Sequence, residues 1–477
     1  MIREKLSVVK TIDELKATYK TLKADLNKEC AEEKKKYVTK YKKDLEKCKS
    51  DFNKTINELK TKLKSASQEE KEHIKFDIDN EKYYQKQKVF EIKNEHHEKL
   101  QKIKDKKNDA FMAYYRKAQE LTDGKVGIGV KLQRKVNDYV YSFNTKQFIL
   151  SNGLYIIILA FIIASIILAP MMGKGNLLTT SNVLQILEQS STRVFFALGV
   201  GGLILLGGTD LSIGRHVGMG AVVTCIILHP GVNIIKVFGY APNFDAIPMF
   251  LRVLMALAIS IILCVLFSAI AGFFTAKLNM HPFVTTLATQ LIIFGLVCYA
   301  TGTTSSGTID SSIKNLLAGR IGNFPILIIY AIVCIAVVWF IWNKTRFGKN
   351  MYAVGGNKEA AAVSGINVFK TTLLVFVFAG VLYGIGSFLE GLRIGTAVAT
   401  TGTGYELDAI AACVVGGISF SGGIGKIKGA VIGVLLFTAI TYILTFFGLD
   451  TNIQFILKGI IIMAAVALDS VKYLKKK

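Results

Sequence analysis

The sequence predicts an all-α, polytopic membrane protein preceded by a charged helical arm, and three observations lead to this prediction. Hydrophobic residues make up 51% of the 477 residues, and the mean hydropathy is +0.40, whereas a soluble protein needs a largely polar surface. Residues 1–147 contain 37 Lys and Arg and 25 Asp and Glu, whereas residues 148–477 contain only 21 and 10. The second part also divides into about ten apolar segments, many of them long enough to cross a bilayer as helices.

The first element is a helical arm over residues 1–122. Residues 1–120 contain neither proline nor glycine, so no residue breaks a helix. Apolar residues recur at steps of three and four from Ile12 to Leu63 and again from Ile74 to Tyr114, which is typical of a coiled coil. Reversal at residues 65–67 would give an antiparallel hairpin about 75 Å long, at 1.5 Å per residue. One unbroken helix in an intermolecular coiled coil is the alternative.

Charge on the arm indicates a solvated surface and not a nucleic-acid site. The whole chain has a net charge of +23, but Lys and Glu alternate along the predicted helices and no recognition motif accompanies them. Residues 123–147 follow as a hinge with Gly124, Gly127 and Gly129, and then as an amphipathic juxtamembrane helix.

The transmembrane domain is predicted over residues 148–477. The segments 194–206, 217–228 and 409–421 are short for a full span and are predicted to be broken or re-entrant helices inside the bundle. The ten segments are 148–169, 194–206, 217–228, 249–276, 283–301, 323–342, 371–389, 409–421, 429–447 and 453–468.

Loop charges predict the orientation of these segments. With ten spans, basic residues such as Arg215, His216 and Lys344 fall in loops on the side of the N-terminus, together with the basic C-terminal tail. By the positive-inside rule both termini are therefore cytoplasmic. Arg252 and Lys458 lie near segment ends, so charges within spans are nearly absent. This argues against a secondary transporter coupled to protons or sodium.

Two Gly-rich stretches resemble each other. Residues 205–212 (L-L-G-G-T-D-L-S) are similar to residues 414–421 (V-V-G-G-I-S-F-S), 209 residues later. Matching interruptions in two halves of a transporter indicate a transport path. Chance similarity between Gly-rich helix ends is the alternative.

Polar residues in or beside the apolar segments form two candidate sets. The first is a candidate translocation path, for which the alternatives are the cytoplasmic surface and helix packing. It consists of Asp210, Ser212, Asn279, Phe283, Thr286 and Gln290. The second set lies at the outer ends of spans and either docks a binding protein by charge pairing or is solvated. It consists of Glu390, Arg393, Glu406 and Asp408.

The loop at residues 343–370 is basic and contains Glu359-Ala360-Ala361 followed by Gly365, an E-A-A-x-x-x-G pattern. A short Ala-rich helix that ends at a glycine suits a knob inserted into a cleft of a partner protein.

Trp342–Asn350 (W-N-K-T-R-F-G-K-N), with this pattern, resembles the cytoplasmic coupling loop of sugar ABC permeases, the family of ribose, galactose and xylose uptake. Residues 207–214, 405–417 and 467–473 are similar to its galactose/methyl-galactoside member, and residues 1–146 depart from the family pattern. The resemblance implies a permease in the bacterial inner membrane, with ribose, xylose or nucleosides as alternative substrates.

The resemblance also implies partners: a separate ABC ATPase, an extracytoplasmic sugar-binding protein and a second permease copy, all in a lipid membrane. The ATPase would contact Arg346, Gly348, Glu359, Ala360, Ala361 and Gly365. We hypothesise that the arm contacts the ATPase or the second permease. No catalytic, cofactor or metal site is predicted, because no phosphate loop and no metal-ligand spacing of His or Cys occurs.

Overall fold

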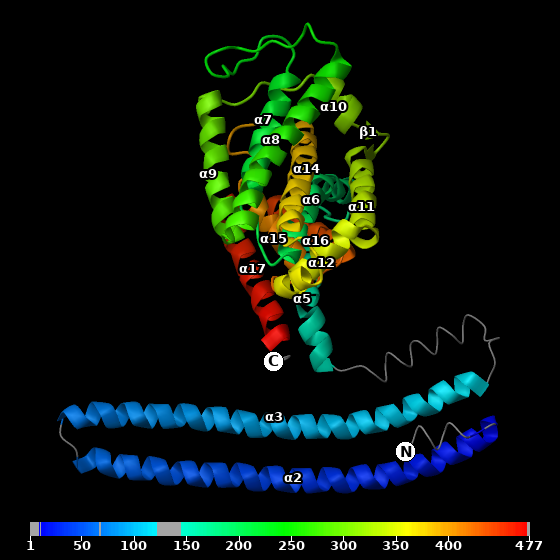
Figure 1. Ribbon diagram of the computed structural model, residues 1–477, viewed down its shortest axis with the longest axis vertical. Coiled ribbons are helices and arrows are strands. Elements are labelled where there is room, and N and C mark those ends of the chain that lie inside the picture. The colour runs from blue at the N-terminus through cyan, green and yellow to red at the C-terminus, as the bar shows by residue number, and fades with distance from the viewer. Residues whose placement is uncertain (1–8, 10, 66–67, 122–144, 475–477) are drawn as a thin grey trace. The chain divides into compact units, whose positions relative to one another are not determined.

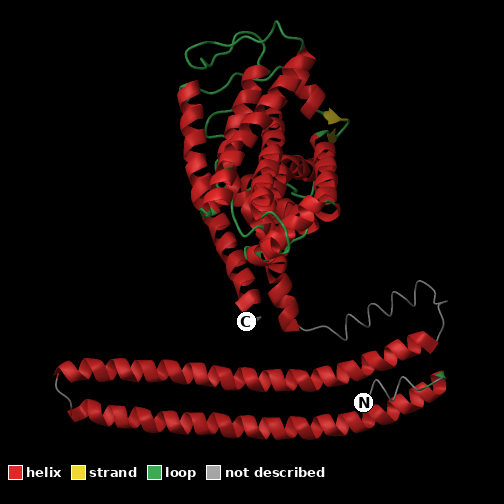
Figure 2. Ribbon diagram, viewed as in Figure 1, coloured by secondary structure: helices red, strands yellow, loops and turns green. Residues whose placement is uncertain are grey.

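The computed structural model describes residues 9, 11–65, 68–121 and 145–474 (Figure 1). The chain divides into two compact units, residues 1–145 and 146–477. Helices dominate both units (Figure 2), and within the described residues the strands form one short hairpin, β1 Arg320–Ile321 and β2 Phe324–Pro325.

The arm is a helical hairpin formed by α2 (Ile12–Ser65) and α3 (Gln68–Leu121). The two helices are antiparallel, because Tyr19 near the start of α2 stacks on Tyr114 near the end of α3 with ring centroids 4.2 Å apart. Farther along, the Lys106 ammonium lies 2.8 Å from the Glu33 carboxylate. The predicted hairpin is thus confirmed, and the alternative of one unbroken helix is wrong. The predicted hinge and juxtamembrane helix lie almost entirely outside the described residues.

The second unit is a bundle in which the ten predicted apolar segments correspond to ten helices. Five of these helices, α8, α9, α11, α14 and α16, are long and apolar enough to cross a membrane. The ten are α5 (Thr145–Met171), α6 (Thr180–Leu205), α7 (Ile213–Ile227), α8 (Met249–Leu278), α9 (Pro282–Thr301), α11 (Leu327–Lys344), α14 (Val368–Ile394), α15 (Tyr405–Val415), α16 (Ile427–Phe446) and α17 (Thr451–Leu474).

Helix α14 occupies the centre of the bundle and packs against α6, α7 and α8 (Figure 1). Its glycines make this possible, since a Cβ atom on Gly380 or Gly384 would collide with the backbone of α8 at Cys264, Val265 or Ile261. Small residues that allow backbones to approach are typical of helix contacts in membranes.

The predicted short segments have two different outcomes. Segment 194–206 belongs to the 26-residue helix α6, because residues 180–193 extend the helix although most of them are polar. Helices α7 and α15 are short, with 15 and 11 residues, and most of their residues are buried in the bundle. The helix of segment 409–421 ends early, at Val415, and the rest of that segment forms turns.

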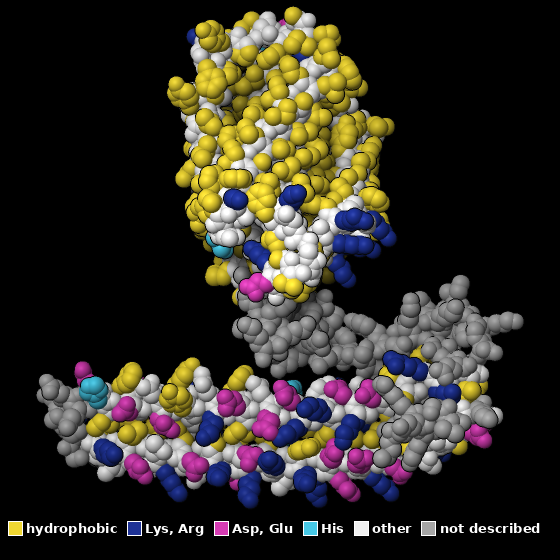
Figure 3. Space-filling model, viewed as in Figure 1, with side chains coloured by type: hydrophobic (Ala, Val, Ile, Leu, Met, Phe, Trp, Pro, Cys, Tyr) yellow, Lys and Arg dark blue, Asp and Glu magenta, His cyan; other side chains and the backbone are white. Residues whose placement is uncertain are grey.

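Among the described residues, three short helices lie outside the ten and the arm. They are α10 (Ser311–Ala318), α12 (Arg346–Gly356) and α13 (Lys358–Val363). The end of the bundle that carries α12 and α13 is called the coupling-loop end below. In Figure 3, hydrophobic side chains cover most of the visible bundle surface, and Lys and Arg gather near this end.

Candidate functional site

The predicted coupling loop consists of α12 and α13, and capping bonds define both ends of α13. The Asn357 side chain accepts a hydrogen bond from the Ala360 N–H at 2.9 Å. At the other end, Gly365 has a left-handed backbone with φ of +82°. The N–H groups of Gly365 and Ile366 donate to the carbonyls of Ala362 and Ala361, both at 3.0 Å. This is a Schellman motif, which explains why a glycine follows the Ala-rich helix.

One face of α13 is exposed and the other packs on the protein. The Ala361 side chain is buried, whereas Glu359 and Ala360 are exposed. The Val363 side chain is 91% exposed although it is apolar. A slim helix with an uncovered apolar side chain and one acidic residue is a suitable surface for a partner protein.

Helix α12 connects this loop to the interior of the bundle. The Tyr352 hydroxyl donates to the carbonyl of Gly425 at 3.0 Å, and the nearby Gly423 N–H donates to the carbonyl of Leu205, the last residue of α6, at 2.8 Å. A Cβ atom on Gly355 would collide with the same Leu205 carbonyl. Movement of α12 would therefore act directly on the end of α6 and on the loop after α15.

The remaining coupling-loop residues lie at the start of α12. Arg346 is its first residue and is exposed. The Gly348 N–H donates to the Thr345 hydroxyl at 3.2 Å. Gly348 is buried, and a Cβ atom there would collide with the carbonyls of Ile341 and Trp342.

The N-terminal ends of the two short helices α7 and α15 meet inside the bundle. Gly214 in the first turn of α7 lies against Gly402, which precedes α15, and a Cβ atom on either glycine would collide with the backbone of the other. Arg215 reaches the same loop, since its guanidinium lies 3.2 Å from the Thr403 hydroxyl. The positive ends of two helix dipoles therefore meet at one place, here called the α7–α15 junction.

The predicted path residue Asp210 lies at this junction, where its side chain is 1% exposed. Its Oδ1 atom accepts hydrogen bonds from the Ser212 N–H at 2.8 Å and the Ser212 hydroxyl at 2.5 Å. Thr286 on α9 contacts the loop before α7, because its hydroxyl accepts a hydrogen bond from the Leu211 N–H at 3.2 Å. The structure thus brings together three of the six predicted path residues.

Asn279, Phe283 and Gln290 are not part of this cluster. Asn279 ends α8 in a left-handed conformation and is exposed, and the Phe283 side chain is 46% exposed. Gln290 is half-buried on α9.

Two further residues of the cluster were missed by the sequence argument. His216 was assigned to a surface loop, but it is fully buried in α7, with ring nitrogens 3.0 Å from the Ser212 carbonyl and 3.2 Å from the Cys264 carbonyl. The Tyr383 ring lies 5.4 Å from the His216 ring. The Tyr383 hydroxyl and Asp210 Oδ2 are both buried, and these two groups interact with each other although no hydrogen bond of ideal geometry joins them. Neither contact could be read from the sequence, because His216 bonds to backbone carbonyls and Tyr383 lies on a distant helix.

The predicted docking residues lie mainly inside the protein, which corrects their assignment to an outer surface. The Glu390 side chain is fully buried and accepts hydrogen bonds from Thr192 at 2.7 Å, Arg393 at 2.7 and 2.9 Å, and Tyr405 at 2.6 Å. Since burial of a charge is costly unless it is paired, these bonds explain its place. Arg393 is half-buried through this pairing.

A second buried ion pair involves Asp408. This residue is 7% exposed, and its carboxylate lies 2.8 Å from the Lys458 ammonium and 3.9 Å from the Arg193 guanidinium. The three charges come from α6, α15 and α17; Arg193 and Asp408 each stand one residue before a predicted apolar segment, and Lys458 is the charge already expected near a segment end. Glu406 is half-buried beside Gly214 at the α7–α15 junction.

The similarity between residues 205–212 and 414–421 has a local cause. Gly207 and Gly417 both have left-handed backbones, with φ of +78° and +83°. Each follows a helix, and the next N–H donates to the carbonyl five residues back, Gly208 to Leu203 at 3.0 Å and Ile418 to Cys413 at 2.9 Å. The similarity thus marks two Schellman motifs. The structure equates Gly207 with Gly417, one residue away from the predicted alignment.

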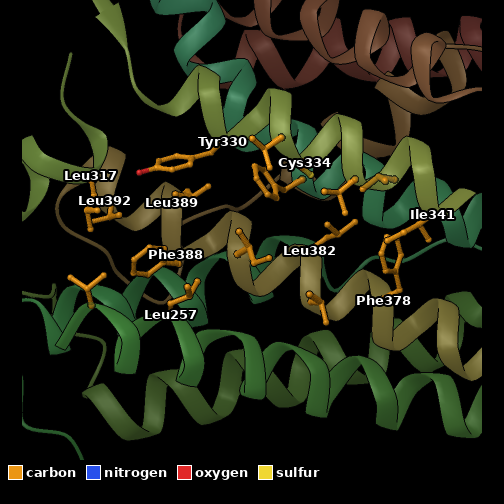
Figure 4. Close-up of a pocket in the computed structure, with 17 residues that line it drawn as sticks. Leu257, Leu317, Tyr330, Cys334, Ile341, Phe378, Leu382, Phe388, Leu389 and Leu392 are labelled. Atoms are coloured by element: carbon orange, nitrogen blue, oxygen red, sulfur yellow. The ribbon is translucent and has the colours of Figure 1, made fainter. Parts of the chain in front are cut away.

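A cavity of about 540 Å³ lies among α6, α8, α10, α11 and α14 (Figure 4). Its walls are apolar, with residues such as Leu257, Phe388 and Leu392, and Tyr330 brings the one hydroxyl group among the lining side chains. A sugar needs several hydrogen-bonding partners, so this cavity does not suit one.

Comparison with known proteins gives the family. Residues 182–466 match the family described as the permease component of the branched-chain amino acid transport system. The chain is 56% identical to the galactose/methyl galactoside import permease of Treponema pallidum over 381 residues, 78% of this chain and 72% of the relative. It is 44% identical to the permease of the same name from Escherichia coli over 346 residues, 70% of this chain and 99% of the relative.

The ribose import permease of Escherichia coli is 32% identical over 301 residues, 62% of this chain and 88% of the relative. No solved structure matches the chain. The predicted resemblance to sugar permeases is confirmed. The family matches residues 182–466, outside the arm, whereas the 78% of the chain aligned with the Treponema pallidum permease is more than residues 147–477 and so includes part of residues 1–146. With its apolar helices and this match over most of the second unit, the chain belongs to the family of branched-chain amino acid transport system permeases and is a multi-pass membrane transport subunit.

Proposed function

We propose that this chain forms the membrane passage of a bacterial ABC importer for galactose and methyl galactosides. The observation that carries the proposal is its identity of 56% and 44% to two permeases of that name, against 32% to a ribose permease. Ribose, xylose or a nucleoside is the second candidate substrate and is less favoured by this ranking.

The energy for transport is proposed to come from ATP hydrolysis on a separate ATPase subunit. The surface of α13 supports this, because Glu359, Ala360 and the 91% exposed Val363 face solvent while Ala361 anchors the helix. Arg346 and Gly348 position α12, whose contacts with Leu205 and Gly425 lead to the interior. Gly365 holds the end of the knob in place.

The proposed orientation places the coupling-loop end and both termini in the cytoplasm. The gathering of Lys and Arg near this end (Figure 3) supports it, since cytoplasmic loops carry an excess of basic residues. An extracytoplasmic sugar-binding protein would then approach the opposite end. A second permease copy, within the lipid of the inner membrane, completes the assembly.

The α7–α15 junction is the proposed crossing point of the sugar. Helix N-termini, Asp210, Ser212 and Thr286 converge there, and interrupted helices in transporters expose backbone groups to the substrate. In this structure the junction is closed, because Asp210 is 1% exposed and His216 is fully buried.

An ATP-independent secondary transporter is the competing function, and the buried charges bear on it. Glu390 is paired with Arg393, and Asp408 with Lys458, so these groups serve one another and not a transported ion. The coupling loop, moreover, has no role in such a transporter.

Sugar uptake in cells tests the proposed function. Deletion of the gene for this chain is expected to abolish uptake of radiolabelled galactose, and a plasmid copy is expected to restore it. Excess unlabelled methyl galactoside should compete for uptake, and excess ribose should not. Unchanged galactose uptake, together with lost ribose uptake, would contradict the proposed substrate.

A further inference from the structure

Helix α3 of the arm carries an aromatic stripe on its exposed surface. Phe76, Tyr83 and Phe90 follow one another at intervals of seven residues, so they lie on one face of the helix. Their side chains are 66%, 59% and 63% exposed, and the neighbouring Tyr84 is 63% exposed. In the described part of the arm, the large hydrophobic side chains with such exposure are these four.

This stripe is separate from the seam that holds the hairpin together. The buried positions of α3 include Ile78 and Ile103, which pack toward α2. Phe76 is two residues from Ile78, about 200° around the helix at 100° per residue. Figure 3 accordingly shows hydrophobic side chains along the edge of α3 that faces away from α2. The hairpin is thus complete without the stripe, and the stripe remains available for a partner.

The charges beside the stripe match those of a second copy of the same helix. If two α3 helices lie antiparallel with Tyr83 at the two-fold axis, Phe76 of each copy faces Phe90 of the other. Asp79 lies four positions before Tyr83, and Lys86 lies three positions after it. In this antiparallel pair, Asp79 of one copy therefore lies beside Lys86 of the other copy. Glu72 lies beside Lys93 in the same way. Asp79 also pairs with Lys82 of its own helix at 2.8 Å, and both side chains stay largely exposed.

The symmetry produces each of these contacts twice, as in any isologous interface. Antiparallel helices place like flanks together, so the row with Asp79 and Lys86 meets its own copy. A parallel pair would set this row against the opposite flank, which carries Asn80, Tyr84 and Gln87, and would lose the Asp79–Lys86 contact. The charge pattern therefore favours the antiparallel pair.

From these observations we propose that the arms of two copies of this chain pair through α3, antiparallel about Tyr83, into a four-helix assembly. Phe76, Tyr83 and Phe90, at roughly 100–150 Å² each on both copies, would bury about 600–900 Å² in the pair, less than a stable specific interface. Such a contact is weak between free molecules. Two copies held together in one transporter raise its effective concentration, so the inference rests on the second permease copy of the proposed function.

Cysteine cross-linking in the full-length chain tests the pairing and its direction. Native cysteines are replaced by serine, and a short bis-maleimide reagent is applied to membranes containing Y83C, F76C or F90C. We expect a covalent dimer with Y83C, and about ten-fold less with F76C or F90C alone. Co-expression of F76C with F90C should restore the dimer, because these positions face each other. N53C, an exposed position on α2, is the matched control and should give no dimer.

Each other outcome overturns the proposal. Strong dimers with F76C alone and F90C alone would show a parallel pair, and absence of a Y83C dimer would show that α3 does not pair with a second copy about Tyr83. Co-purification of two differently tagged chains that lack residues 1–121 reports pairing of the membrane domains by themselves. If these domains pair but Y83C does not cross-link, the inference fails while the proposed function stands.

Charge exchange gives a second test that does not depend on the aromatic side chains. The substitution K86E places like charges at both Asp79 contacts and should lower the Y83C dimer yield about three-fold, since exposed pairs contribute little each. Combining K86E with D79K should restore the yield. A yield that does not change with either variant contradicts the antiparallel register.

Discussion

Glu390 shows why a buried charge can be essential to this bundle. Its carboxylate is fully buried and is held by Arg393, Tyr405 and Thr192, which come from α14, α15 and α6. A buried ion pair adds little net folding free energy, but removal of one partner destabilises the protein strongly because the other charge stays buried and unpaired.

We therefore expect Glu390→Leu to destabilise the purified permease by about 3–5 kcal/mol, because Arg393 would keep its charge without a partner. Thermal unfolding followed by size-exclusion chromatography measures the effect. The double variant Glu390→Leu with Arg393→Met should recover a large part of the loss. Equal stability of the single variant and the parent chain would show that the network is dispensable.

Asp210 differs from Glu390 because, among the described residues, no cation pairs with its buried carboxylate: Oδ1 accepts from Ser212, and the other oxygen interacts with the Tyr383 hydroxyl. A buried carboxylate without a paired cation is costly, and this cost is understandable if the carboxylate gains a further partner in another state of the transport cycle. We expect Asp210→Asn to lower sugar uptake at least about ten-fold while the protein remains in the membrane at its normal level.

A matched control for this change is Thr289→Val on α9. Its hydroxyl is also buried, but it bonds only within its own helix, to the Thr285 carbonyl at 2.8 Å. Uptake should be nearly unaffected by Thr289→Val. If both variants lose uptake equally, the effect belongs to helix packing and not to the α7–α15 junction.

At the scale of elements, the coupling loop depends on the left-handed conformation of Gly365. A side chain at φ of +82° is strained whatever space surrounds it, at a cost of about 1–2 kcal/mol. We expect Gly365→Asp to leave the permease in the membrane but to lower substrate-stimulated ATP hydrolysis in the complex with its ATPase. Gly356→Asp is the control, because Gly356 ends α12 without a left-handed backbone and has open space around its Cβ position. Normal stimulation with Gly365→Asp would remove this loop from the coupling role.

The elements also show what could be predicted from the sequence. Hydropathy and periodicity are local properties, so the ten apolar segments and the two helices of the arm followed from them. The start of α6 did not, because Ser190, Ser191 and Thr192 are polar and become buried only against other helices. The junction and the ion pairs could not be predicted either. Thr192 and Glu390, for example, are 198 residues apart and meet only in the folded bundle.

For the whole molecule, coupling to a cytoplasmic ATPase requires the coupling-loop end to face the cytoplasm. In a cysteine-free chain, Val363→Cys should react with a membrane-impermeant maleimide only after the cytoplasmic side is exposed. Ser311→Cys, beside Asp310 at the opposite end, should react in intact cells stripped of their outer membrane. Both sites are exposed. Labelling of position 311 only from the cytoplasmic side would contradict the ten-span orientation.

In the proposed function this chain passes a sugar across the membrane at the expense of ATP hydrolysed on another subunit. The most direct measurement is sugar uptake by proteoliposomes that contain the permease and its ATPase, with the sugar-binding protein added outside. Uptake is compared with and without ATP in the lumen, on the side of the ATPase. We expect galactose to accumulate only with ATP, and expect Gly365→Asp to reduce this accumulation while Gly356→Asp does not. Accumulation driven by an ion gradient without ATP, or without the ATPase subunit, would contradict the account.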